Sequence, residues 1–210
     1  SQRLAQQLSS TTFRIYSSSD LVGVQVGGAV KNVLAIASGM AKGVGFGENS
    51  QAALITRGLS EMRRLATALG GYSETLSGLS GLGDVLLSCS SRQSRNFLFG
   101  ELLGNGNGKH IAREKIGGVV EGWFSTSSVM KKQKELDIDL PICKTVYDIL
   151  YNEKDILVIN QWLMAQMGTV GPMIGQHHQF HHYNPGKSEF GEERYFKIAK
   201  RIYGELDARL

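Results

Sequence analysis

The sequence predicts a mostly α-helical fold, in which a multi-helical domain follows one short strand and carries a helical tail. Apolar residues recur at steps of three and four along most of the chain, which is the spacing of one face of an α-helix. Residues that cap and stop helices stand between these stretches. Only residues 13–16 form a convincing strand, so we expect no sheet from this chain alone.

The first long helix is predicted over residues 22–42, because its apolar residues share one helical face. This stripe consists of Val26, Ala29, Val33, Ile36 and Met40. Gly27 and Gly28 lie inside the helix, where each glycine costs about 1 kcal/mol relative to alanine. We therefore expect another segment to pack closely there.

Four further helices are predicted from their caps and stops. Asn49 or Ser50 can cap the next helix, and Gly70 and Gly71 can stop it. The remaining helices are predicted from Ser94 to about Leu103, from Ser125 to Leu136, and from Pro141 to about Tyr151.

The composition is that of a globular protein, with 41% hydrophobic and 20% charged residues. No apolar run approaches the roughly 18–20 residues of a membrane helix, and we expect no transmembrane segment. The net charge of +4 is spread without a basic block, which suits an anionic small molecule. No nucleic-acid-binding motif is recognised, so we expect no nucleic-acid partner.

The two cysteines, Cys89 and Cys143, form neither a CxxC pair nor a metal spacing. We expect both to be reduced, buried thiols, as is usual in the cytoplasm. The start of the chain shows no secretory signal, which agrees with a cytoplasmic protein.

The chain changes character near residue 155. Twenty of its 26 glycines lie before Asp155, whereas four of its five histidines lie after it. Residues 155–210 carry equal numbers of basic and acidic residues, so the net charge belongs to the first part. No Pro/Gly/Ser linker marks the change, and we interpret it as a junction between two sequences of different origin.

Lys31 is the first candidate for chemistry, because it lies mid-helix beside the apolar stripe. A lysine held near apolar surface has its charged form disfavoured, and it can exchange a proton with a carbonyl oxygen. The alternative is an exposed helix lysine with a solvated ammonium group.

Asp84 is the second candidate, at the end of the glycine-rich run 77–84. Gly81 and Gly83 would allow the backbone to approach a ligand, and the aspartate could orient a lysine or bind a hydroxyl. The alternative is a loop aspartate that caps a helix.

Ser94, Arg95 and Asn96 form a third candidate at a predicted helix N-terminus. Free N–H groups, the helix dipole and a guanidinium fork together suit a phosphate group. The alternative is a capped surface helix with a solvated arginine. A fourth, weaker candidate is Glu121, which could accept hydrogen bonds from a sugar hydroxyl.

Five segments together closely resemble bacterial NAD(P)-dependent glycerol-3-phosphate dehydrogenase, in both order and spacing. They are GGAVKNVLAIASG (27–39), AALITRGLSEM (52–62), GLSGLGD (78–84), SRN (94–96) and VVEG (119–122). The resemblance extends over about residues 1–154 and covers the family's C-terminal, all-α substrate domain. It implies that residues 1–20 are the end of a nucleotide-binding domain and that residues 21–154 form the helical substrate and catalytic domain.

The resemblance also implies roles for individual residues. Lys31 would donate and accept the proton at the C2 oxygen of the substrate. The substrate, sn-glycerol 3-phosphate or dihydroxyacetone phosphate, would be bound by Lys31, Asp84, Ser94, Arg95 and Asn96, with Asn32 and Ser88 as further contacts. The cofactor, NAD or NADP, would be contacted by Arg95, Val119 and Glu121. No metal is implied, and the family reaction supplies glycerol phosphate for phospholipid synthesis.

The family's dinucleotide-binding domain, with its glycine-rich turn, would precede residue 1, and we find no such turn in this sequence. Because half of the active site belongs to that domain, we expect the chain not to turn over substrate alone.

The tail, residues 155–210, resembles the C-terminal helical domain of glutathione-transferase-like proteins. The likeness rests on NQWLMAQMGTVGPM (160–173), ERY (193–195) and RIYGELD (201–207). It suggests an alternative function, a helical dimerisation module without chemistry, in which an apolar Met/Trp surface over 155–175 favours a homodimer. A misassembled junction near residue 155 is the third alternative.

The tail also holds two histidine pairs with i, i+4 spacing, 177/181 and 178/182, which could clasp a metal on a helix. No HExxH glutamate lies between them, and we expect partly exposed histidines that pack beside Phe180 and Tyr183.

Overall fold

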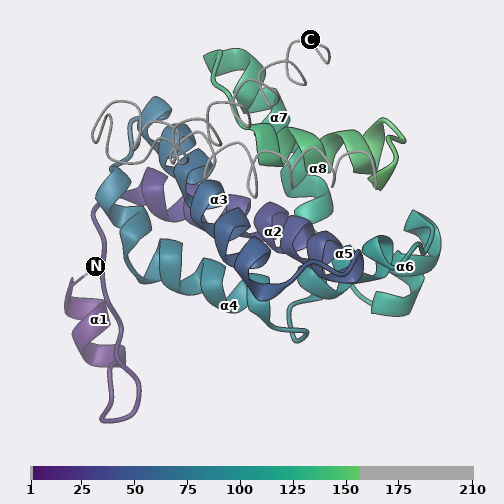
Figure 1. Cartoon of the computed structure of the whole chain (residues 1–210). Helices are drawn as coiled ribbons and strands as arrows, with labels where there is room; N and C mark the ends of the chain where they lie inside the picture. The colour runs from purple at the N-terminus through teal and green to yellow at the C-terminus, as the bar shows by residue number, and fades with distance from the viewer. Residues whose placement is uncertain (1, 157–210) are drawn as a thin grey trace, which may run out of the picture.

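The computed structural model describes residues 2–156, and the helices that follow residue 20 form a bundle (Figure 1). The helices in chain order are α1 (Gln2–Leu8), α2 (Leu21–Gly43), α3 (Glu48–Ala68), the 3-10 turn η1 (Ser73–Ser77), the π-helical turn η2 (Leu79–Gly83), α4 (Asp84–Ser90), α5 (Arg95–Gly104), α6 (Lys109–Ile116), α7 (Glu121–Leu136) and α8 (Pro141–Tyr151). The mostly helical fold predicted from the sequence is confirmed.

Helix α2 is the centre of the bundle, and α3, α4, α5, α7 and α8 all pack against it (Figure 1). Its middle is almost fully buried, with Val33, Leu34 and Ile36 each at 0% exposure. Among the described helices, α2 is the one long and apolar enough to cross a membrane. However, 61% of its most apolar stretch is buried within the bundle, and a buried core helix has the same apolar composition.

Glycines bring α2 and α5 into backbone contact. A Cβ on Gly39 would clash with the carbonyl oxygen of Phe97, and one on Gly100 would clash with that of Ile36. Gly104 meets the Met40 carbonyl oxygen in the same way one turn later. The crossing therefore requires residues without side chains on both helices.

The close packing expected at Gly27 and Gly28 is present at only one of them. A Cβ on Gly27 would clash with the carbonyl oxygen of Ser80, because η2 lies against α2 there. A Cβ on Gly28 would have no atom of the described residues within 4 Å.

Asp20 fixes the start of α2. Its carboxylate accepts hydrogen bonds from the Thr75 hydroxyl (2.6 Å), from Gly23 N (2.8 Å) and from Tyr72 N (2.9 Å). These bonds, the Thr75 bond first, lower the pKa of the Asp20 carboxyl below its ordinary value. The same side chain thus caps α2 and holds η1 against it.

The predicted start of the helix at Ser125 was wrong, although its predicted end at Leu136 is confirmed. Helix α7 begins four residues earlier, at Glu121, and the side chain of Asn96 accepts a hydrogen bond from Gly122 N at 2.9 Å. This cap comes from α5, so the local sequence of α7 could not reveal it.

Glu61 caps α8 from α3 in a similar way. Its carboxylate accepts hydrogen bonds from Ile142 N (2.7 Å) and Cys143 N (3.1 Å), and the side chain is only 3% exposed. Burial raises the pKa of this carboxyl above its ordinary value, although both hydrogen bonds oppose the shift. Pro141 occupies the first turn of α8, as predicted.

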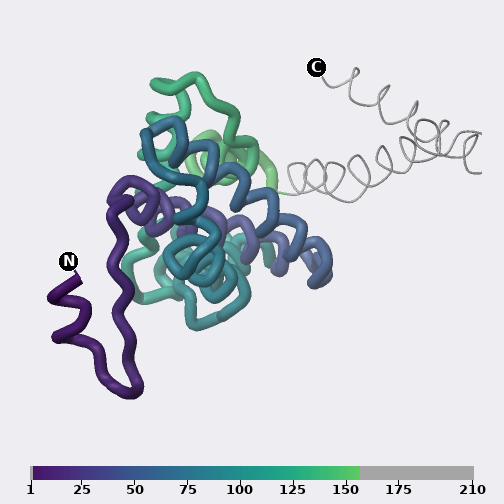
Figure 2. The backbone as a smooth tube through the Cα atoms, turned by 90° about the vertical axis from the view of Figure 1, so that its left-hand side faces the viewer, coloured from purple at the N-terminus to yellow at the C-terminus, as the bar shows by residue number. Residues whose placement is uncertain are grey.

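The predicted strand at residues 13–16 was wrong. These residues are extended and largely exposed, and no strand occurs among residues 2–156. Local bonds hold the segment instead, for example from Ile15 N to the Ser9 hydroxyl at 3.0 Å. Without a neighbouring strand, the β-forming side chains have no ladder to join. Helix α1 and this segment stand away from the bundle in both views (Figures 1 and 2).

Cys89 and Cys143 are free and buried, as expected. Burial raises the pKa of the Cys89 thiol to about 12, so both the burial and the protonated state agree with a structural role. The tail's predicted helices, histidine pairs and Met/Trp surface all fall after residue 156, outside the described residues.

Candidate active site

Lys31 and Asp84 meet on one face of α2, although they lie 53 residues apart in the sequence. The Lys31 ammonium group donates a hydrogen bond to Asp84 Oδ2 and forms an ion pair with it. The two side chains are 24% and 36% exposed, so a ligand can reach both. The sequence-based idea that Asp84 orients a lysine is thus matched by an observed contact.

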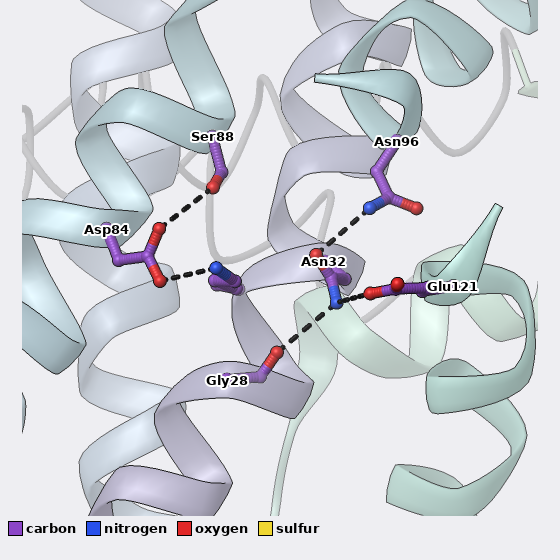
Figure 3. Close-up of polar contacts among 7 residues, drawn as sticks. Gly28, Asn32, Asp84, Ser88, Asn96 and Glu121 are labelled. Carbon is purple, nitrogen blue, oxygen red and sulfur yellow. Dashed lines mark hydrogen bonds and ion pairs between the residues drawn. The ribbon is translucent and has the colours of Figure 1, made fainter. Parts of the chain in front are cut away.

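Asp84 is positioned by the turn that precedes it. It is the first residue of α4, directly after the π-helical turn η2. Gly81 in that turn lies against the backbone of Leu76, where a Cβ would clash. The Ser88 hydroxyl, one turn further along α4, donates to Asp84 Oδ1 at 3.5 Å (Figure 3). Asp84 therefore has one oxygen for Lys31 and one for Ser88.

A second set of polar contacts begins at Asn32, the residue after Lys31. Asn32 Oδ1 accepts a hydrogen bond from Asn96 Nδ2 at 2.9 Å, and Asn32 Nδ2 donates to Glu121 Oε2 at 3.3 Å (Figure 3). Asn32 Nδ2 also donates to the Gly28 carbonyl oxygen at 3.2 Å. Asn32 and Asn96 are each only 8% exposed, so their amides are fixed by protein contacts.

This set of contacts brings the N-terminus of α5 next to the Lys31 turn. Ser94 caps α5 by accepting a hydrogen bond from Phe97 N at 3.3 Å, as predicted. Arg95 is exposed, and its guanidinium lies 3.1 Å from where a Cβ on Gly118 would be. Within residues 2–156, Arg95 makes no hydrogen bond or ion pair, so its donors are available to an anion.

The N-terminus of α7 also packs against α2 at Asn32, the residue after Lys31. Gly122 lies so close to α2 that a Cβ would be 2.6 Å from the Asn32 carbonyl oxygen. This packing places Glu121 at the Asn32 amide, while Val119 stays 58% exposed. The role of Asn96 as the link between α2, α5 and α7 was missed from sequence, because only the tertiary structure shows that its amide bonds to both Asn32 and Gly122.

Two hollows of the described chain lie away from these polar side chains. One hollow of about 740 Å³ lies between residues 16–18, the start of α2 and η2, and an apolar groove of about 310 Å³ lies between α2, α3 and α7. Neither is lined by Lys31, Asp84 or Arg95. No cluster of three metal-ligating side chains occurs in the described part of the chain.

The Lys31–Asp84 pair and the N-terminus of α5, which carries the exposed Arg95, are linked through Asn32, the neighbour of Lys31, and its bond from Asn96. The cationic groups suit a phosphate ester, and the ammonium–carboxylate pair suits proton exchange with an adjacent oxygen.

The family model described as the C-terminus of NAD-dependent glycerol-3-phosphate dehydrogenase matches residues 20–160. Glycerol-3-phosphate dehydrogenases (NAD(P)+) from Vibrio cholerae serotype O1 and Aliivibrio fischeri are each 49% identical over 157 residues. Each match covers 75% of this chain and 46% of the relative, so the chain spans about half the length of the curated relatives it matches.

Solved structures give the same result. The crystal structure of glycerol-3-phosphate dehydrogenase from Coxiella burnetii matches with a TM-score of 0.75 and 43% identity, over 78% of this chain and 50% of that one. The structure of DsGPDH from Dunaliella salina has a TM-score of 0.67 at 22% identity, over 77% of this chain and 29% of that one, and shares the fold.

These matches give no support to the glutathione-transferase likeness of residues 155–210. They agree over the helical bundle that carries Lys31 and Asp84. The chain therefore belongs to the family of C-terminal domains of NAD-dependent glycerol-3-phosphate dehydrogenases.

Proposed function

We propose that this chain supplies the substrate-binding and proton-transferring half of an NAD(P)-dependent glycerol-3-phosphate dehydrogenase. The reaction interconverts sn-glycerol 3-phosphate and dihydroxyacetone phosphate. The observation that carries the proposal is the Lys31–Asp84 pair, which forms on the same turn of α2 whose Asn32 is bonded to Asn96 at the N-terminus of α5. A small phosphorylated ligand is the partner that this arrangement fits best.

Lys31 transfers the proton in this proposal. Its ammonium group donates to the C2 carbonyl oxygen of dihydroxyacetone phosphate, and the amine takes the proton back from the C2 hydroxyl in the reverse direction. Asp84 holds the ammonium group in place through their ion pair. Ser88, bonded to the other Asp84 oxygen, is in position to contact a substrate hydroxyl.

Arg95 and the N-terminus of α5 bind the phosphate group in this proposal. The guanidinium offers a two-pronged donor, and the first N–H groups of α5 add the positive end of the helix dipole. Ser94 starts the helix, and Asn96 supports the site by fixing Asn32.

The nicotinamide cofactor, NAD or NADP, supplies the hydride to C2 when it is bound, or removes it. Arg95, Val119 and Glu121 would hold part of it. Their side chains fit such a group, because Arg95 and Val119 are exposed and Glu121 presents a carboxylate at the surface. Residues 1–20 are proposed as the end of the nucleotide-binding domain, which agrees with the separation of α1 and residues 13–16 from the bundle (Figure 2). The reduced, buried cysteines support a cytoplasmic location.

The proposal is tested by an assay of dihydroxyacetone-phosphate reduction with NADH and NADPH, with and without an added nucleotide-binding domain. We expect turnover only from the mixture. Lys31→Met should reduce that turnover by about 10²- to 10⁴-fold, the range of general acid–base catalysis.

Lys42→Met is the matched control, since Lys42 lies on the same helix in an exposed ion pair with Glu48. It should leave the rate unchanged. Undiminished turnover by the mixture containing Lys31→Met would contradict the proposed role of Lys31. Turnover by the chain alone would contradict the proposal that a separate nucleotide-binding domain is needed.

A further inference from the structure

Gly28 lies inside α2, on the face that carries the candidate active site. It precedes Lys31 by three residues and Asn32 by four, so all three share one side of the helix. Figure 3 shows Gly28 one turn from Asn32, whose amide donates to the Gly28 carbonyl oxygen at 3.2 Å. Gly28 therefore forms part of the α2 surface that carries the site residues.

The structure of the described residues gives no packing reason for a glycine at this position. No described atom lies within 4 Å of a Cβ built on Gly28, and the residue is exposed. Its neighbour Gly27 is different, because a Cβ there would clash with the Ser80 carbonyl oxygen. At Gly27 the packing offsets the unfavourable helix propensity of glycine, but at Gly28 nothing described does.

Backbone conformation does not explain Gly28 either. Its φ is not in the left-handed region, so alanine could adopt the same conformation. Alanine would also be the better helix former. The missing methyl group thus keeps clear a space that opens onto the Lys31 turn.

We propose that Gly28 is a substrate-contact residue, whose bare backbone lets a three-carbon phosphate ester lie against α2 within reach of the Lys31 ammonium group. This inference rests on the proposed function and adds a steric determinant to it. The Gly28 carbonyl oxygen already accepts a bond from Asn32, so the contact offered to the ligand is the Cα and the peptide surface. A methyl group there would push the carbon chain of the ligand away from the helix.

The test compares Gly28→Ala with the wild type in the full chain. Thermal unfolding measures stability, and calorimetric titration with sn-glycerol 3-phosphate measures affinity. We expect an unchanged or raised Tm, because alanine favours the helix, together with at least about a tenfold loss of affinity.

Gly108→Ala is the control, since Gly108 also has no described atom within 4 Å of a built Cβ, has a φ of −62°, and precedes α6 outside the site. Its affinity should equal that of the wild type. A fall in Tm for Gly28→Ala would show that another part of the chain fills the space, and would overturn the inference.

Equal affinity of Gly28→Ala and the wild type would also overturn the inference while leaving the proposed function in place. A wild-type chain that binds no sn-glycerol 3-phosphate at high millimolar concentration would remove the proposed function together with this inference.

Discussion

Helix α2 has covered and open regions that use glycine in opposite ways. In the covered regions, Gly27 lies against η2, and Gly39 and Gly43 lie against the backbone of α5, where any side chain would clash. In the open region, Gly28 is exposed one turn before Lys31, and no described atom lies within 4 Å of a Cβ built on it. The covered regions tolerate no added atom, whereas the open region has room. A glycine in a helix therefore indicates close packing in one region and room for a ligand in the other, and only the neighbours in three dimensions distinguish the two.

The sharpest test of this contrast is Gly39→Ala. The added Cβ would meet the Phe97 carbonyl oxygen and the Glu101 amide, and rigid backbone cannot move aside as a side chain can. We expect the free energy of unfolding to fall by about 3 kcal/mol or more, which is the upper range for overpacked cores. Urea unfolding followed by circular dichroism measures it. A loss below about 1 kcal/mol would mean that the α2–α5 crossing is looser than described.

Glu61→Ala tests the interior by removing a polar contact instead of adding volume. It leaves the N–H groups of Ile142 and Cys143 buried without their carboxylate partner. Each unpaired group costs about 1–3 kcal/mol, and relief from burying a charge offsets part of that. We expect a net loss of about 2 kcal/mol in the free energy of unfolding. Glu135→Ala is the comparison variant, since Glu135 pairs with Lys132 on the surface, and its loss should stay below about 1 kcal/mol.

Asp84→Asn addresses the open region, where Asp84 pairs with Lys31. The Lys31–Asp84 pair is partly exposed, so solvent screening limits its contribution to stability. We expect the free energy of unfolding to change by less than about 1 kcal/mol, while affinity for sn-glycerol 3-phosphate falls at least about tenfold. A large loss of stability with unchanged affinity would reverse the assignment of this face from ligand binding to structure.

The smallest expected effect is a pH dependence of stability that Asp20 contributes. Its folded-state pKa is lowered, so its contribution is present above the unfolded pKa and is lost as pH falls through the folded pKa. Asp20→Asn should therefore lose less stability than the wild type as the pH is lowered from about 5 toward 3. Thermal unfolding across this range checks the slope. Identical slopes for the two proteins would contradict the role given to the Thr75, Gly23 and Tyr72 bonds.

The contribution of Glu61 to stability should depend on pH in the opposite direction. Burial raises its folded-state pKa, so its contribution is fully present below the unfolded pKa and declines as pH rises through the folded pKa. Glu61→Gln should therefore remove a decline that the wild type shows above about pH 4.5. A wild-type curve with no such decline relative to the variant would count against the direction of this shift.

The parts of the fold predicted from sequence are those fixed by local patterns. The apolar stripe over 22–42 and the Ser94 cap gave α2 and α5 nearly residue for residue. Contacts from other helices were not predictable in this way. Helix α7 begins before Ser125 because the Asn96 side chain, from α5, accepts a hydrogen bond from its first turn. Residues 13–16 form no strand because no partner strand among the described residues lies beside them.

The candidate site was predicted from the resemblance rather than from single residues. Lys31 and Asp84 each had a reasonable alternative as a surface charge, and their contact emerges only when η2 folds against α2. The amide link through Asn32 and Asn96 gave no local signal, because an asparagine side chain can equally bond to the nearby backbone. The difference between Gly27 and Gly28 was likewise invisible before the packing of η2 was known.

The most direct test of the account is a calorimetric titration of the full chain with sn-glycerol 3-phosphate, with glycerol as the comparison ligand. We expect saturable binding of the phosphate ester and no binding of glycerol, because Arg95 and the α5 N-terminus recognise the phosphate. Arg95→Ala should abolish the binding, whereas Arg57→Ala, an exposed arginine on α3, should preserve it. Equal binding by wild type and Arg95→Ala, or no binding by the wild type at high millimolar ligand, would contradict the account.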